Sequence, residues 1–276
     1  MALVKMQQRN VLLHYHIFKN AGTTFERVLD ENYGEGHLKF DGPFSFSVIN
    51  QDQLSTIIQR HPSAIACSSH QIHLPAPSTV SFRPIPVVFI RNPLLRIRSV
   101  FLFSKPATER VVDEVTPSDP LTGFEEWVTQ KLSGDKNLLQ ISNLQTSMLG
   151  RCYNLLPKAE EREGRVEFDL QLAINNLSLV PCLGRVEYFD IDVSSFTETL
   201  ARLDIPFVYN RRKAENVSSP DHKNTAEEQL QAMKQSLSAE IWQKLHWLNH
   251  QDLMLYEITH DIMEKRLKNG FQIPLV

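Results

Sequence analysis

Short apolar runs alternate with segments of helical periodicity along this chain, and polar turns separate them. The clearest run covers residues 86–90, which are rich in β-branched side chains, follow a proline-rich stretch and lead directly into Arg91, Asn92 and Pro93. Strands that alternate with helices need crossover connections, which make the strands parallel and cover both faces of the sheet. The sequence therefore predicts an α/β fold with three layers, a mostly parallel sheet flanked by helices.

The remaining elements follow from the same patterns. We expect further strands at residues 11–16, 64–67 and 180–186, and helices at residues 23–30, 51–59 and 194–203. Thr23 is expected to cap the first helix, because threonine favours the N-cap position. Residues 225–267 are helical in pattern and predict three helices, so the C-terminal portion is expected to be helical. No repeat or linker divides the chain, which predicts a single domain over residues 1–276.

Composition limits the classes of function. The 276 residues include 42% hydrophobic and 22% charged residues, as in ordinary globular proteins. A formal net charge of -3 provides no general attraction to nucleic acid, so none is expected as a partner. No membrane span is expected, and the N-terminus lacks a secretory pattern, which predicts a cytoplasmic protein. The three cysteines form no metal-binding spacing, so we expect reduced thiols and no metal.

A loop suited to phosphate follows the first expected strand. Its residues are Lys19, Asn20, Ala21, Gly22, Thr23 and Thr24. A strand-to-helix turn offers free amides and the positive end of the helix dipole, which favour an anion. The lysine precedes the glycine, so this is not a Walker A motif. Taken alone, the segment is equally consistent with an ordinary capped helix beside a solvated lysine.

Two segments resemble a known family. The run HIFKNAGTTFERVL resembles the 5′-phosphosulfate loop of sulfotransferases that use 3′-phosphoadenosine 5′-phosphosulfate (PAPS), especially the carbohydrate type, which is heparan-sulfate 2-O-like or bacterial family 2. The run VVFIRNPLLRIRSVFLF is similar to the 3′-phosphate motif of this family, with Arg91 and Ser99 at the two contact positions. Later segments, from NLQTSMLG to DLMLYEI, extend the resemblance over nearly the whole chain. Phe18, Asn20 and Asn92 depart from the usual residues of the two motifs.

The resemblance implies a fold of the phosphate-loop type, an activity and a set of site residues. The co-substrate would be PAPS and the product 3′-phosphoadenosine 5′-phosphate, with no metal. The residues implied at the donor are Lys19, Asn20, Ala21, Gly22, Thr23, Thr24, Arg91 and Ser99, and Lys19 would also be catalytic. His70 would be the base for the acceptor, with His73 as an acceptor contact or the alternative base. Glu187 matches a family carboxylate and is a candidate substrate contact.

Other functions stay open at this point. A phosphate-loop kinase shares the strand-loop-helix pattern, but Arg91 stands where a magnesium-binding carboxylate is needed. A non-catalytic nucleotide- or glycan-binding module would have the same fold. The acceptor is expected to be a hydroxyl or an amine of a carbohydrate or small metabolite, and no oligomeric state is predicted. Residues 104–123 are expected to influence acceptor specificity, and the basic stretch 211–223 is expected to contact the nucleotide.

Overall fold

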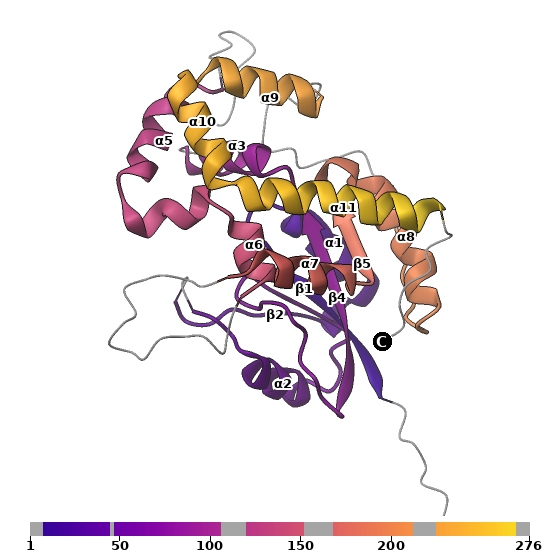
Figure 1. The fold of residues 1–276 in the computed structure, drawn as a ribbon. Helices are drawn as coiled ribbons and strands as arrows, with labels where there is room; N and C mark the ends of the chain where they lie inside the picture. The colour runs from indigo at the N-terminus through magenta and orange to yellow at the C-terminus, as the bar shows by residue number, and fades with distance from the viewer. Residues whose placement is uncertain (1–7, 45–46, 106–119, 152–167, 212–224, 269–276) are drawn as a thin grey trace, which may run out of the picture.

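A five-stranded sheet forms the centre of the molecule, in the order β2-β3-β1-β4-β5 (Figure 1). The computed structural model describes residues 8–44, 47–105, 120–151, 168–211 and 225–268. The strands are β1 (Arg9–Tyr15), β2 (His37–Lys39), β3 (Ala66–Ser69), β4 (Phe82–Ile90) and β5 (Cys182–Arg185). All four strand pairings are parallel, which confirms the α/β class.

Helices cover both faces of the sheet. On one face α1 (Gly22–Tyr33) and α8 (Phe189–Ala201) pack against the strands, around Phe25 and Phe196. On the other face lie α2 (Gln51–Arg60), α6 (Leu144–Leu149), α7 (Leu170–Ser178) and α11 (His250–Lys268). Leu12 and Leu13 of β1 are both fully buried and belong to opposite apolar clusters, as alternation along a central strand requires. The predicted three layers are confirmed.

A third apolar cluster lies beyond the sheet, where helices pack only on helices. It joins α3 (Pro93–Ser104), α5 (Phe124–Leu132), α9 (Ala226–Gln235) and α10 (Ala239–Leu248). Figure 1 shows α5, α9 and α10 grouped at one end of the molecule, close to α3. The three helices α9, α10 and α11 confirm the helical C-terminal portion. Three short 3-10 turns complete the described elements: η1 (Gly34–Gly36), η2 (Asp135–Ile141) and η5 (Val186–Tyr188).

The structure differs from the expected elements in three details. Thr23 is not the N-cap of the first helix, because α1 begins at Gly22 and Ala21 holds the N-cap position. The strand β2 was not predicted, because its three residues HLK carry no apolar alternation and pair only with β3 at the sheet edge. β4 also begins earlier than expected, at Phe82, because the residues before position 86 pair with β1 as well. It therefore includes the prolines that were expected to precede it.

The strand order places three loops at one edge of the sheet. β1 lies between β3 and β4, with Tyr15 opposite Ser69 on one side and Val88 on the other. The order in which the strands are added to the sheet therefore reverses at β1. Ligands of open α/β sheets bind at such a point, beyond the carboxyl ends of the strands. The loops that begin at His16, His70 and Arg91 follow these three strands. Within the described ranges, no helix has the length and apolar character that a bilayer span requires.

Candidate active site

The loop between β1 and α1 has an unusual backbone. Lys19 and Ala21 have φ angles of 67° and 58°, although neither is a glycine. Such left-handed residues cost about 1–3 kcal/mol each and gather where a site requires them. Ala21 provides no side-chain cap, so the first amides of α1 are not bonded by a capping side chain. A strained turn that opens onto uncapped helix amides is an arrangement suited to an anion.

Gly22 lets a histidine lie against the start of α1. A Cβ atom at Gly22 would stand 1.9 Å from Cδ2 and 2.1 Å from Nε2 of His16, so no other residue fits without moving this ring. Nδ1 of His16 in turn forms a hydrogen bond with Oε1 of Glu26, 2.8 Å away. The glycine of the loop is therefore required by a side-chain contact as well as by the turn.

Arg91 joins the second predicted loop to the first. Its Nη1 donates to the backbone oxygen of Lys19 at 2.9 Å, while Nε is buried without a hydrogen-bond partner among the described residues. Burial lowers the pKa of Arg91, and the nearby Glu187 opposes that shift. An unpaired guanidinium donor beside a phosphate-type loop fits a bound oxyanion.

The side-chain amide of Gln145, on α6, bonds to both Arg91 and Asn20. Its Oε1 accepts from the backbone N–H of Arg91 at 2.9 Å, and its Nε2 donates to the Arg91 carbonyl at 2.9 Å. The same Oε1 accepts from Nδ2 of Asn20 at 2.7 Å. Gln145 was not predicted as a site residue, because a glutamine on a short helix belongs to no motif.

Asn20 braces the loop from inside. The residue is 1% exposed, and its Nδ2 donates to the carbonyl of Phe89 as well as to Gln145. Its backbone N–H is bonded to the carbonyl of Ile17. Both nitrogens of Asn20 therefore hold the loop in place, while its Oδ1 is buried without a hydrogen-bond partner among the described residues. The donor contact that the resemblance implies at Asn20 stays a prediction.

Asn92 is the N-cap residue of α3. Oδ1 of Asn92 accepts from the backbone N–H groups of Leu94 and Leu95, at 3.0 and 3.3 Å. Asparagine therefore caps this helix where the resembling family has aspartate. Oε1 of Glu187 accepts from the backbone N–H of Asn92 at 3.1 Å, so this predicted substrate contact lies beside the loop that begins at Arg91.

The other donor candidates lie on the loop and on the helices α1 and α3 that follow the two strands. Nζ of Lys19 lies 4.3 Å from the ring centroid of Phe103, a cation–π contact that Phe18 extends at 6.0 Å. Thr23 and Thr24 are exposed on the first turn of α1, and Ser99 is half-buried on α3. The structure thus links the loop residues Lys19 and Asn20 to Arg91, whereas Ser99 stays a prediction. The aromatic side chains around Lys19 were not predicted.

His70 lies at the end of β3 with a carboxylate beside it. Its Nδ1 is 3.0 Å from Oδ2 of Asp41, and its ring stacks on that of His16 with centroids 3.8 Å apart. Burial and the neighbouring His16 lower the pKa of His70, and the bond to Asp41 only partly opposes them. His70 is therefore neutral near pH 7, which is the form that accepts a proton.

His73 has both ring nitrogens engaged. Its Nδ1 is 3.1 Å from the carbonyl of Gln71, and its Nε2 is 3.2 Å from Nη1 of Arg151. Burial, aided by Arg151, lowers the pKa of His73 to about 3. A nitrogen that already accepts from a guanidinium is poorly placed to take a proton, so the geometry favours His70 over His73.

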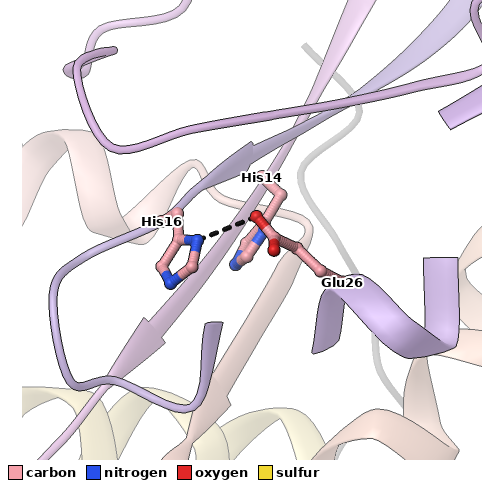
Figure 2. Close-up of side chains that lie close together, drawn as sticks. All are labelled: His14, His16 and Glu26. Atoms are coloured by element: carbon pink, nitrogen blue, oxygen red, sulfur yellow. Dashed lines mark hydrogen bonds and ion pairs between the residues drawn. The ribbon is translucent and has the colours of Figure 1, made fainter. Parts of the chain in front are cut away.

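His14, His16 and Glu26 form a compact polar group (Figure 2). Their potential ligand atoms lie within 4.8 Å of one another, a spacing compatible with a metal ion. However, Nδ1 of His14 is bonded to Oγ of Ser68 at 3.0 Å, and Nδ1 of His16 is bonded to Glu26. Burial raises the pKa of Glu26, but the hydrogen bond from His16 and the charges of His16, Lys39 and His70 together lower it by more, so the net shift is downward. These hydrogen bonds thus account for the arrangement of the three side chains. In the sequence, its sign is the pair of histidines two residues apart, at positions 14 and 16, on the first strand.

Two predictions fall partly outside the described residues. Residues 106–119 of the expected specificity segment and residues 212–223 of the basic stretch are not described. Arg211, the first residue of that stretch, pairs with Asp190 through Nε at 2.9 Å. Cys67 and Cys182 are free, buried thiols, as expected, and Cys152 lies outside the described ranges.

Comparison with known proteins identifies the class. The model of a sulfotransferase family matches residues 3–258, and the chain belongs to this family. An uncharacterized protein of Archaeoglobus fulgidus is 26% identical over 270 residues, which cover 95% of this chain and 99% of that protein. No solved structure matches the chain. Membership in the family supports sulfuryl transfer as the general activity and disfavours the phosphate-loop kinase.

Proposed function

We propose that this protein transfers a sulfuryl group from PAPS to a hydroxyl or amine of a carbohydrate or small metabolite. The observation that carries the proposal is the position of the His16 ring. It touches the backbone of Gly22 in the phosphate-type loop on one side and stacks on His70 on the other. A single side chain therefore connects the donor loop with the candidate base.

The donor site combines charge and backbone amides. The amides at the start of α1, with Thr23 and Thr24, would hold the 5′-phosphosulfate, and Lys19 would neutralise charge on the oxygen that bridges sulfur and phosphorus. Arg91 and Ser99 would hold the 3′-phosphate, the group that distinguishes this nucleotide from ATP-type ligands. The unpaired Nε of Arg91 supports this assignment.

The reaction requires the acceptor and the donor in line at sulfur. The acceptor oxygen or nitrogen forms a bond to sulfur, the bond between sulfur and the bridging oxygen breaks, and 3′-phosphoadenosine 5′-phosphate departs with the electron pair. His70 takes the proton of the acceptor. A neutral histidine held near the loop is suited to this role at neutral pH.

A transfer assay tests the proposal. Purified protein is incubated with ³⁵S-labelled PAPS and a panel of glycans, alcohols, phenols and amines, and labelled products are separated. We expect transfer to at least one acceptor class, with loss of transfer in Lys19→Ala and His70→Ala. Lys234→Ala, which removes an exposed lysine on α9, is the matched control and should retain activity. Nucleotide binding without transfer to any acceptor would favour the non-catalytic binding module.

A further inference from the structure

A carboxylate from the neighbouring strand end holds His70 through both of its oxygens. Oδ1 of Asp41 accepts from the backbone N–H of His70 at 2.9 Å and from Oγ of Ser69 at 2.8 Å. Its Oδ2 lies 3.0 Å from Nδ1 of the His70 ring. An ionised carboxylate can only accept hydrogen bonds, so Nδ1 must carry the hydrogen. The lone pair of the neutral ring is then on Nε2.

The segment that carries Asp41 is itself held in place. It follows β2, whose Lys39 pairs with Ser68 of β3 two residues before His70. The amide of Gln71 then crosses between the two loops: its Oε1 accepts from the N–H of Gly42 at 2.5 Å, and its Nε2 donates to the carbonyl of Phe44 at 2.8 Å. The contact between Asp41 and His70 is therefore part of a braced loop pair.

A ring contact also fixes the histidine. The His16 ring stacks on His70 with an interplanar angle of 27°. The hydrogen bond between His16 and Glu26, drawn in Figure 2, holds His16 in turn. The Asp41 bond sets the rotation of the His70 ring, and the His16 stack sets its plane. Together they restrict the direction in which Nε2 can point.

We propose that Asp41 is a positioning residue for sulfuryl transfer, holding the His70 imidazole in the tautomer that leaves Nε2 free to take the acceptor proton. This inference rests on the proposed function. As the acceptor forms its bond to sulfur, its proton moves to Nε2 and the ring becomes an imidazolium. The Asp41 carboxylate stabilises this charge and remains ionised, as in other carboxylate–histidine pairs that act on a hydroxyl.

Asp41 and His70 are partly exposed, so the role of Asp41 can be tested by mutation. The side chains of His70 and Asp41 are 44% and 40% exposed, and ion pairs in contact with solvent contribute little to stability. Asp41→Asn is therefore expected to fold like the original protein. A second carboxylate–histidine pair, in which Oδ1 of Asp30 lies 2.8 Å from Nδ1 of His37, provides a matched control at another histidine.

The experiment measures the ring and the reaction separately. ¹⁵N NMR at pH 7.5 reports the tautomer of His70 in the full chain, with assignment from His70→Ala. We expect Nδ1–H in the original protein and in Asp30→Asn, and a shift toward Nε2–H in Asp41→Asn. With an acceptor found by the transfer assay, kcat should fall roughly 10- to 100-fold in Asp41→Asn, because general base catalysis contributes about 10²–10⁴-fold and His70 itself is still present. The affinity for 3′-phosphoadenosine 5′-phosphate should be unchanged.

A double variant separates positioning from other roles. If Asp41 acts through His70, adding Asp41→Asn to His70→Ala should lower kcat no further. An Nε2–H tautomer in the original protein, or an unchanged tautomer and kcat in Asp41→Asn, would overturn the proposal. The expected tautomers without transfer to any acceptor would support the orientation and count against the proposed function, so the two failures are distinguishable.

Discussion

Gly22 is the residue on which the two halves of the candidate site depend. In Gly22→Ala the new methyl group would overlap the His16 ring, which must then rotate away from Glu26 and His70. We expect at least about tenfold weaker binding of 3′-phosphoadenosine 5′-phosphate, since displaced loop groups cost on the order of 1.4 kcal/mol or more. Calorimetry measures the change. Gly36→Ala is the matched control, because its methyl group meets nothing closer than 3.5 Å; equal affinity in both variants would contradict the account.

The protonation of His70 should appear in the pH dependence of the reaction. Its pKa is lowered by burial and by His16, so the base is free above that value and is lost as the pH falls through it. We therefore expect the acidic limb of kcat/KM below about pH 6.5, the ordinary value of histidine. A profile recorded in buffers where circular dichroism shows folded protein checks this, and an acidic limb above pH 7 would be inconsistent with a neutral His70.

At the scale of elements, the N-cap residue of α1 makes no side-chain hydrogen bond, which is also the case for α5, α6 and α8. Helices α2 and α9 have capping boxes, and Asn92 caps α3, whereas Ala21 leaves the first amides of α1 uncapped. A helix end without a cap is less stable by about 1 kcal/mol. We attribute this omission to the anion that the amides are proposed to bind.

Ala21→Asp tests this interpretation with its neutral isostere as control. A carboxylate at the N-cap would compete for the amides and repel the donor, so nucleotide affinity should fall at least about tenfold. Ala21→Asn lacks the charge and suits the left-handed backbone, and it should bind several-fold better than Ala21→Asp. Neither change should lower the urea midpoint of unfolding. Equal affinities in the two variants would exclude an anion at this helix end.

Sequence patterns reached most of the elements and part of the site. The apolar run at residues 86–90 and the helical C-terminal pattern were sufficient for the parallel sheet and for α9 to α11. The positive φ of Ala21 was not predictable, because alanine rarely adopts it and nothing in its neighbours demands it. Asp41 and Gln145 were missed because their roles depend on segments that are distant in sequence. The single-domain and cytoplasmic assignments stay predictions.

For the whole molecule, buried neutral histidines predict a loss of stability in acid. Burial lowers the pKa of His14 well below its usual value, and that of His37 is also lowered. Below about pH 6.5 the unfolded chain takes up protons that these folded side chains exclude, so stability is complete above that pH and falls below it. From pH 7.5 to 5.5, His14 alone should lower the free energy of unfolding by at most about 1.4 kcal/mol, the limit in which the folded side chain takes up no proton. Urea unfolding at both pH values measures this, and an unchanged or higher free energy of unfolding at pH 5.5 would contradict it.

The measurement that tests the central claim most directly is calorimetric titration with 3′-phosphoadenosine 5′-phosphate beside ATP. We expect the first nucleotide to bind at least about tenfold more tightly, because Arg91 recognises its 3′-phosphate. Arg91→Ala should abolish this preference, while Arg60→Ala, which removes an exposed arginine at the end of α2, should not. No binding of 3′-phosphoadenosine 5′-phosphate by the folded protein, or a preference for ATP, would contradict the proposed donor.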